Sequence, residues 1–169
     1  MDTIDEMPYA DVGSIHHEPT DPVAAYDKSM LLGELNAGAV ENIVSVAGPE
    51  ADPPFILELR HHGGAYARPP AVANAVGGRD ASFTMFSASE SEPGGLEEVR
   101  RVHAALHERM RPWSTGGTLL NFNGIDDVDP ASVRAAFTPD DYARLREVKT
   151  VYDPGNVFRI TQNIPPARA

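Results

Sequence analysis

The sequence predicts an α+β fold in which helices cover an antiparallel sheet. Three observations favour this class. Apolar residues alternate with a period of two in some stretches and recur with a helical period in others. The 14 glycines and 15 prolines concentrate in the segments between these stretches. Hydrophobic residues make up 41 % of the chain, enough for a packed core, and the predicted order is strand, helix, strand, strand, helix, strand, helix, helix.

Composition argues against several classes of function. The chain has 169 residues, the size of one domain, and 14 Lys and Arg against 25 Asp and Glu give a net charge of −11, which disfavours a nucleic-acid partner. The lack of cysteine excludes disulfides, thiol catalysis and cysteine-ligated metal centres. No apolar stretch reaches the ~18 residues of a membrane span, and the acidic N-terminus lacks a signal-peptide pattern. We therefore expect a soluble, cytoplasmic chain with no membrane partner.

An arm, a short strand and a helix are predicted at the N-terminal end. Residues 1–28 have no periodicity and are expected to form an irregular arm, followed by a strand at Met30–Leu32. A helix then begins near Leu35-Asn36 and ends at Gly48-Pro49. Its predicted buried face consists of the apolar residues at helical spacing, which are Val40, Ile43, Val44 and Ala47.

Two strands joined by a long loop are predicted next, at residues 55–60 and about 81–88. The first strand places Phe55, Leu57 and Leu59 on one face and Ile56, Glu58 and Arg60 on the other. Glu58, Arg60 and the nearby Tyr66 are candidate catalytic residues, which would orient a polar substrate or exchange a proton if this face borders a cavity. The alternative is an ion pair on a solvated sheet edge.

A second helix is predicted from Leu96 to Met110, with Pro112 ending it. Its expected buried stripe comprises Leu96, Val99, Val102 (or His103), Leu106 and Met110. His103 and His107 have the four-residue spacing of a two-histidine metal site. The chain offers no third ligand and no suitably placed glutamate. We therefore predict that both histidines lie on a solvated flank and that no metal is bound.

The C-terminal part is predicted to hold a short strand at Thr118–Phe122 and two capped helices. Asp129 caps Pro130–Ala136, and Thr138 caps a helix that runs to about Val151. The second helix is expected to bury Tyr142, Leu145 and Val148, and residues 157–160 to form a last strand or an extended clip. The predicted divisions are residues 1–28 as the arm, 29–128 as the sheet with its helices and 129–169 as the C-terminal helices and clip.

Two regions of the sequence resemble a known family. Residues 142–166, YARLREVKTVYDPGNVFRITQNIPP, closely resemble the C-terminal segment of berberine-bridge-enzyme-like flavoproteins, which are FAD-linked oxidases of the vanillyl-alcohol-oxidase superfamily. Residues 58–65 and 113–122 are similar to strands of that family's substrate domain. The resemblance covers about residues 7–166 and implies that the chain is a partial substrate-binding domain of an FAD-linked oxidase, ending in the family's clip.

The resemblance implies FAD as cofactor and a reaction that passes a hydride from a C–H bond next to oxygen or nitrogen to the flavin, which O2 reoxidises. The family's flavin-facing Tyr-x-Asn-Tyr pattern matches Leu119, Asn121 and Phe122. Leucine accepts no proton, so the family's usual base is absent here. The cofactor-side residues implied are Asn121, Phe122, Asn156, Gln162 and Asn163. Each of these amides also fits a bond inside the fold, and Asn156 fits a turn.

The sequence contains no glycine-rich phosphate loop like that of the family's FAD-binding domain. We therefore expect the substrate-binding part of an FAD-dependent oxidoreductase, inactive without an FAD-binding domain that is missing or separate. Its expected partners are that domain, a small-molecule substrate and a second copy bound through an exposed sheet. The alternative is a non-enzymatic α+β binding or dimerisation module without flavin, favoured by Leu119 and disfavoured by the retained clip at residues 155–166.

Overall fold

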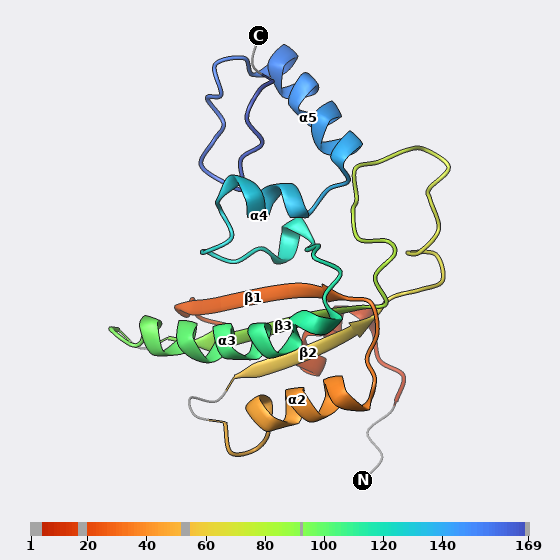
Figure 1. Ribbon diagram of the computed structural model, residues 1–169. Helices are drawn as coiled ribbons and strands as arrows, with labels where there is room; N and C mark the ends of the chain where they lie inside the picture. The colour runs from red at the N-terminus through yellow and green to blue at the C-terminus, as the bar shows by residue number, and fades with distance from the viewer. Residues whose placement is uncertain (1–4, 17–19, 52–54, 92, 168–169) are drawn as a thin grey trace.

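The computed structural model describes residues 5–16, 20–51, 55–91 and 93–167. At its centre is an antiparallel three-stranded sheet of order β1-β3-β2 (Figure 1). The strands are β1 (Ala25–Leu32), β2 (Ile56–His61) and β3 (Phe83–Glu90). Because β3 is the middle strand, Met85 lies opposite Met30 on one side and opposite Leu59 on the other. The predicted fold class, an antiparallel sheet covered by helices, is confirmed.

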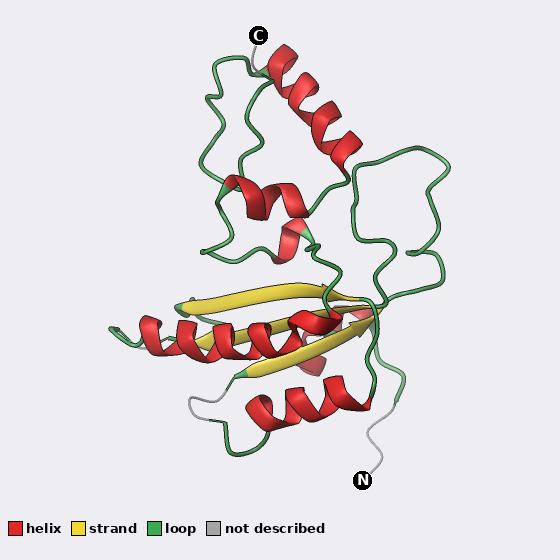
Figure 2. Cartoon of the chain, viewed as in Figure 1, coloured by secondary structure: helices red, strands yellow, loops and turns green. Residues whose placement is uncertain are grey.

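Two helices pack on one face of this sheet. Helix α2 spans Ala37–Ala47 and helix α3 spans Leu96–Met110, with α3 running along the strands and α2 beside it (Figure 2). The hydrophobic core between these layers contains Leu32, Ala39, Ile43, Met85, Leu106 and Met110. Burial of one large apolar side chain stabilises a fold by about 1.5–3 kcal/mol, so this layer holds the sheet and both helices together.

Helix α2 lies where the sequence predicts but buries a different stripe. The Asn36 side chain accepts a hydrogen bond from the Ala39 N–H and so caps the first turn. Ala39 and Ile43 face the core, whereas Val40 and Val44 are 45 % and 59 % exposed. The prediction that Val40 and Val44 are buried was wrong, because the core side of the helix is centred one residue earlier and each residue turns the helix by about 100°.

The predicted strand at Met30–Leu32 was too short. Strand β1 begins at Ala25, within the expected arm, and pairs with β3 along its whole length. Lys28 shares the helix-facing side of the strand with apolar neighbours, which interrupts the apolar alternation and hides the strand in the sequence. The described part of the arm holds a short 3-10 helix, Tyr9–Asp11, and the short helix α1, Gly13–His16.

Residues 111–135 form a layer of turns that ends in a helix. Its elements are η2 (Arg111–Trp113), η3 (Leu120–Phe122) and α4 (Pro130–Ala135). The predicted cap of α4 is confirmed, because the Asp129 carboxylate accepts hydrogen bonds from the N–H groups of Ala131 and Ser132.

The predicted strand at Thr118–Phe122 was wrong. The Phe122 N–H donates to the Leu119 carbonyl at 2.8 Å, which closes the 3-10 turn η3. Pairing with the edge of β1 occurs just before it, where the Leu31 N–H donates to the Gly117 carbonyl. The run of apolar residues had a strand-like composition, but the chain turns after Gly117 and uses Phe122 to pack on the sheet face.

Helix α5 spans Pro139–Tyr152, and its predicted cap is confirmed by a hydrogen bond from the Asp141 N–H to the Thr138 hydroxyl. It stands away from the sheet (Figure 1). The expected burial of its apolar stripe was wrong, because Tyr142 and Leu145 are only half-buried and Val148 is 36 % exposed. A helix that does not reach the sheet finds too little protein surface to bury a full stripe.

Residues 153–167 return along α5 as an extended segment, so the extended clip is the form found for residues 157–160. The Arg146 guanidinium of α5 donates to the Pro166 carbonyl at 3.0 Å and fastens the clip to the helix. Phe158 in the middle of the clip is 81 % exposed.

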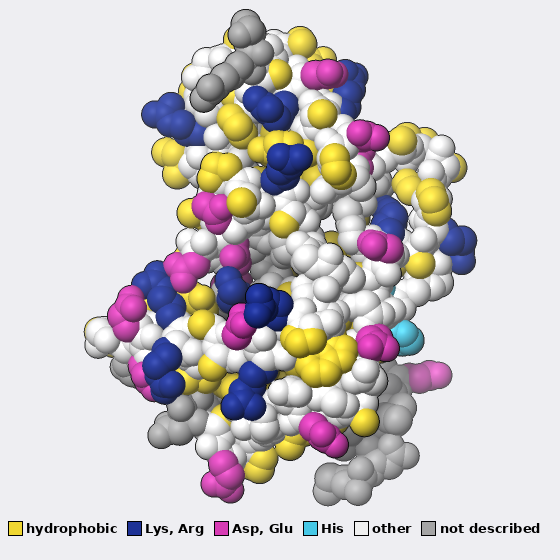
Figure 3. Space-filling model, viewed as in Figure 1, with side chains coloured by type: hydrophobic (Ala, Val, Ile, Leu, Met, Phe, Trp, Pro, Cys, Tyr) yellow, Lys and Arg dark blue, Asp and Glu magenta, His cyan; other side chains and the backbone are white. Residues whose placement is uncertain are grey.

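The described helices are all too short or too polar to cross a membrane. In the view of Figure 3, basic and acidic side chains are intermingled over the lower part of the molecule. Pairs at i,i+3 spacing account for much of this pattern around α3: Arg100–Glu97, Arg101–Glu98 and Arg111–Glu108. Such exposed pairs are screened by water and salt, so they keep the surface hydrated rather than hold the fold together.

Candidate active site

The sheet face opposite α2 and α3 carries two of the catalytic candidates. Strand alternation places Glu58 and Arg60 of β2 on this face, and the register puts Phe86 and Thr84 of β3 beside them. Among the described residues, turn η3 packs against part of this face through Phe122. We refer to this surface, defined by Glu58, Arg60, Thr84, Phe86 and Phe122, as the open face.

A guanidinium and two aromatic rings form the centre of the open face. Arg60 donates two hydrogen bonds to the Glu58 carboxylate, from Nε at 2.6 Å and from Nη2 at 2.9 Å. The Arg60 Cζ atom lies 4.8 Å from the centre of the Phe122 ring, and Phe122 meets Phe86 edge-on at 5.6 Å. The hydrogen bonds that Arg60 donates to Glu58 raise the pKa of Arg60, so the guanidinium stays charged. The ion pair that the alternative interpretation expects is present, and the catalytic role of Glu58 and Arg60 stays a prediction.

Tyr66 lies apart from this pair. Its ring packs against His62 at 4.5 Å and below Arg79 at 5.5 Å, and its hydroxyl donates to the Gly77 carbonyl at 3.4 Å. Burial raises the pKa of the Tyr66 phenol. Tyr66 therefore fastens the long loop after β2, and the structure does not place it against Glu58 or Arg60.

His62 is a site neighbour that the sequence reasoning did not single out. It continues the alternation of Glu58 and Arg60, and its Nε2 lies 2.8 Å from the hydroxyl of the buried Thr84. Its Nδ1 atom is buried without a hydrogen-bond partner among the described residues, and burial lowers the pKa of the imidazole. The sequence signal was its position two residues after Arg60, at the start of the glycine pair Gly63-Gly64.

Asp27 of β1 was hidden within the segment predicted to be an arm. Alternation and register place it on the same side of the sheet as Phe86. Its carboxyl is half-buried, and burial, followed by the negative charge of Asp127, raises its pKa. The Asp27 carboxyl therefore keeps its proton to a higher pH than an exposed aspartate does.

The cofactor candidates are distributed over two regions. Asn121 is exposed at the tip of η3, next to Phe122 on the open face. Gln162 reaches back from the clip, and its Nε2 donates to the Asn123 carbonyl at 3.4 Å. Asn156 has a left-handed φ of 49°, which agrees with its expected role as a turn residue. The Oδ1 atoms of Asn156 and Asn163 are buried without a hydrogen-bond partner among the described residues.

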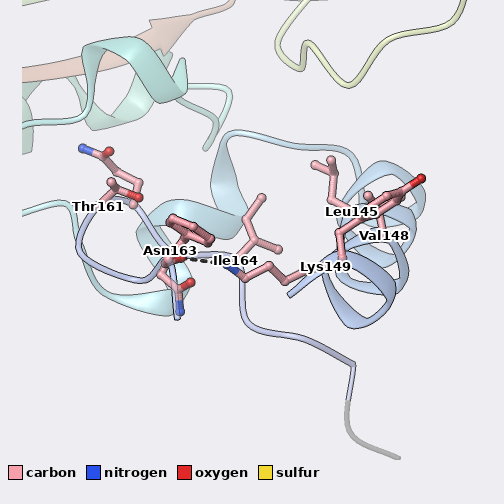
Figure 4. Close-up of a pocket in the computed structure, with 9 residues that line it drawn as sticks. Leu145, Val148, Lys149, Thr161, Asn163 and Ile164 are labelled. Atoms are coloured by element: carbon pink, nitrogen blue, oxygen red, sulfur yellow. Dashed lines mark hydrogen bonds between the residues drawn. The ribbon is translucent and has the colours of Figure 1, made fainter. Parts of the chain in front are cut away.

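A cavity of about 370 Å³ lies between α5 and the clip (Figure 4). Its lining residues are Leu145, Val148, Lys149, Tyr152, Phe158 and residues 161–164. The Lys149 ammonium donates to the Phe158 carbonyl at 2.7 Å and pairs with Asp153 at 2.6 Å, which closes one wall. Gln162 and Asn163 therefore line a mainly apolar cavity. Arg60 and Phe122, which contact each other on the open face, do not line this cavity.

A smaller polar cleft, of about 130 Å³, lies between β1 and the turns that follow η2. The hydroxyls of Ser29 and Thr118 are 3.1 Å apart, and Thr118 donates to the Asn123 amide oxygen at 2.9 Å. Lys28 and Asp127 form an ion pair at 3.1 Å beside it. The described residues include no group of three histidine or acidic side chains arranged to hold a metal ion.

Comparison with known proteins shows that the chain is similar to FAD-linked oxidoreductases. Residues 121–165 match the family described as berberine and berberine like. Two uncharacterised FAD-linked oxidoreductases of Bacillus subtilis (strain 168) are similar: YvdP is 34 % identical over 111 residues and YgaK is 31 % identical over 107 residues. Each match covers 63 % of this chain and 23 % of the relative, so the chain spans about a quarter of the length of these relatives.

Solved structures share the fold. A carbohydrate oxidase from Microdochium nivale has a TM-score of 0.68 at 21 % identity, covering 89 % of this chain and 34 % of its own. Berberine bridge enzyme from Eschscholzia californica has a TM-score of 0.66 at 22 % identity, covering 90 % and 35 %. The 6-hydroxy-D-nicotine oxidase of Arthrobacter nicotinovorans has a TM-score of 0.66 at 23 % identity, covering 98 % and 38 %.

The resemblance that the sequence motifs predicted, to part of a berberine-bridge-enzyme-like FAD-linked oxidase, is thus confirmed.

Proposed function

We propose that the chain is the substrate-binding part of an FAD-dependent oxidoreductase, which passes a hydride from a small-molecule substrate to flavin and is reoxidised by O2. One observation carries the proposal. Phe122, which lies in the berberine-like segment, packs on Phe86 and under Arg60, so the family's segment and the polar face of the sheet form one surface. The FAD-linked relatives support the same class of reaction.

The residues present fit a flavin, which would supply the hydride acceptor when bound. The half-buried rings of Phe86 and Phe122, which meet edge-on, leave part of their surface for contact with a flat conjugated ring. The buried amide oxygens of Asn156 and Asn163 have no hydrogen-bond partner among the described residues, and leaving such an atom unpaired costs about 1–3 kcal/mol. We infer that these two oxygens accept hydrogen bonds from the cofactor or from an FAD-binding domain that packs on the clip.

In this proposal Glu58 accepts the proton that leaves the substrate, and Arg60 positions the Glu58 carboxylate. Leu119, at the position of the family's usual base, has no group that accepts a proton. The two hydrogen bonds from Arg60 favour the charged carboxylate of Glu58 and hold it on the open face. Asp27, whose pKa is raised by burial and by Asp127, is a further carboxyl on that side of the sheet.

The test of these roles is flavin reduction by candidate substrates under anaerobic conditions, with an FAD-binding domain present. Glu58→Gln keeps the shape of the side chain but lowers its affinity for a proton, so we expect the reduction rate to fall at least tenfold while flavin remains bound. Glu41→Gln, at an exposed position of α2, is the matched control and should leave the rate unchanged. An unchanged rate in Glu58→Gln would remove Glu58 from this role.

A second candidate function is a flavin-free binding module that dimerises through its exposed sheet. The absence of a base at Leu119 and the exposure of apolar side chains such as Ile56, which is 68 % exposed on β2, favour it. Gel filtration with and without FAD separates the two functions. A flavin-containing species at the elution volume of the chain supports the oxidoreductase part, and a colourless stable dimer supports the module.

A further inference from the structure

Two histidines of α3 lie in the core between the helix and the sheet, against the expectation that they form a solvated flank. His103 is fully buried and His107 is 7 % exposed. His103 Nδ1 lies 2.7 Å from the Ser87 hydroxyl, and His107 Nε2 lies 3.3 Å from the same oxygen. His103 Nε2 lies 2.9 Å from the Ser89 hydroxyl. These four side chains, which we call the histidine–serine network, join α3 to β3.

One arrangement of protons satisfies the network while both imidazoles are neutral. The Ser87 hydroxyl donates to the Lys28 carbonyl at 3.3 Å, so its oxygen is free to accept N–H donors from His103 Nδ1 and His107 Nε2. His103 Nε2 then accepts the proton of the Ser89 hydroxyl. A further proton on His103 Nε2 reverses this last bond, so that the imidazole N–H donates to the Ser89 hydroxyl oxygen, and it places a positive charge among buried groups.

The surroundings of the network oppose such a charge. The positive charge of Lys28 on β1 disfavours a charge on either imidazole, and the ring of Phe55, the residue before β2, packs on His103 at 5.3 Å. Tyr26 of β1 meets His103 edge-on at 5.1 Å. The acids nearest to this region are engaged by other groups: Asp127 pairs with Lys28, and Asp126 pairs with Arg100 and with Tyr26.

The other titratable groups on the packed elements lie elsewhere. Glu41 of α2 is exposed, and Glu58 and Arg60 of β2 point to the open face. His61 stacks on Phe83 at the far end of β2. The structure therefore provides no carboxylate, among the described residues, that pairs with a protonated His103 or His107.

We propose that the histidine–serine network is an acid-sensitive latch, which holds α3 on the sheet while both imidazoles are neutral and releases it when they take up protons. Its consequence for the open face is direct, because β3 contributes Ser87 to the latch and the adjacent Phe86 to the opposite side of the same strand. Release of α3 in acid therefore also loosens the surface proposed to meet flavin and substrate.

The direction in which pH changes the stability of the fold follows from the pKa values of His103 and His107. Burial, with Lys28 second, lowers the pKa of His103 from 6.5 to about 4, and burial lowers that of His107 to about 3. The neutral form is therefore favoured in the folded chain, and its contribution to stability is complete above pH 6.5 and declines as the pH falls from 6.5 towards 4. The paired carboxylates Asp126 and Asp153 have lowered pKa values, so their loss of charge comes at lower pH.

The test is urea unfolding of the whole chain between pH 7 and pH 4.5, followed by the fluorescence of Trp113. This single tryptophan follows α3 and donates to Asn36, the cap of α2. Two protons taken up on release increase the unfolding constant by as much as about a hundredfold per pH unit, and one proton by about tenfold. The glutamine of His107→Gln does not titrate, so we expect this variant to take up about one proton fewer on unfolding. Its unfolding constant should therefore depend less steeply on pH than that of the wild type.

Two controls separate the latch from other titrations. His61→Gln, at an exposed position, should leave the pH dependence unchanged. Burial also lowers the pKa of His62, which lies outside the network, so His62→Gln measures the separate contribution of His62 to the pH dependence of unfolding. If His107→Gln does not fold, NMR titration of the imidazoles in the wild-type chain decides instead. Neutral His103 and His107 at pH 5 in the folded state support the latch, and titration of both near pH 6.5, or an unchanged slope in His107→Gln, overturns it.

Discussion

Gly124 is the position at which one added methyl group should disturb both the fold and the open face. Gly124 is buried where the turn after η3 meets β1. A Cβ atom there would lie 2.2 Å from the Asp27 carbonyl oxygen and 3.1 Å from its carbonyl carbon. Both contacts are with backbone in the middle of β1, which cannot move aside as a flexible side chain would. Gly124→Ala therefore has to push the turn away from the sheet.

The size of the effect follows from that displacement. The distance from the added Cβ atom to the Asp27 carbonyl oxygen would be about 1 Å shorter than an ordinary contact. Overpacking of this kind usually costs about 1–3 kcal/mol. The turn also carries Asp127, which pairs with Lys28, and it follows Phe122 directly, so a shift of the turn weakens contacts on both sides. We expect a loss of about 2 kcal/mol or more in the free energy of unfolding, or ~4–8 °C in Tm.

Urea unfolding and thermal unfolding measure this loss. Gly155→Ala is the matched control, because its added Cβ atom would meet only the Val157 side chain, at an ordinary 3.8 Å. The control should stay within about 0.5 kcal/mol of the wild type. If Gly124→Ala were as stable as Gly155→Ala, the close packing of the turn on β1 would be refuted.

Three further predictions concern the core, a cap and a buried phenol. Leu106→Ala removes a fully buried side chain between α3 and the sheet and should cost about 2–5 kcal/mol in urea unfolding; a loss below 1 kcal/mol would mean that α3 does not pack as described. Thr138→Ala removes the cap of α5 and should cost about 1 kcal/mol, whereas Thr138→Ser should restore most of it, and equal stability of the two variants would contradict the cap. Burial, assisted by Asp126, raises the pKa of Tyr26 to about 12, so ultraviolet titration should show one of the five tyrosines ionising about two pH units late, and Tyr26→Phe should abolish that late step.

Local signals in the sequence predicted the helix ends well. Asp129 and Thr138 are followed by prolines and cap the helices that they were expected to cap, because capping depends on residues within one turn. The Glu58 and Arg60 spacing predicted one shared strand face in the same way. Period-two alternation requires no knowledge of the partner strand.

Burial depended on contacts that the sequence does not contain. His103 and His107 were expected on a solvated flank because the chain offers no third metal ligand, with His103 the alternative to Val102 in the buried stripe. Ser87 and Ser89, of a strand about fifteen residues away, supply their hydrogen bonds instead. Val44 of α2 was assigned to the core because it is apolar and at helical spacing from Val40 and Ala47, yet it is 59 % exposed. In both cases the packing partner, rather than the residue type, decides which face turns inwards.

The candidate site was predicted in its parts and not in its arrangement. Phe122 was named for its resemblance to a family position, on a strand that does not form, and it still reaches the sheet face through turn η3. Asp27 and His62 escaped notice because one lay in a segment without visible periodicity and the other in a loop rich in glycine. Their roles depend on pairing between strands far apart in the sequence.

The central claim, that the open face meets the flavin ring, is tested most directly by fluorescence titration of the chain with riboflavin and with FAD. Because the chain is proposed to contact the ring and not the pyrophosphate, both probes should be quenched with similar affinity. Phe122→Ala should weaken that affinity at least fivefold, and Tyr9→Ala, an exposed aromatic in the arm, should not change it. No saturable quenching, or equal affinity in the wild type and Phe122→Ala, would contradict the claim.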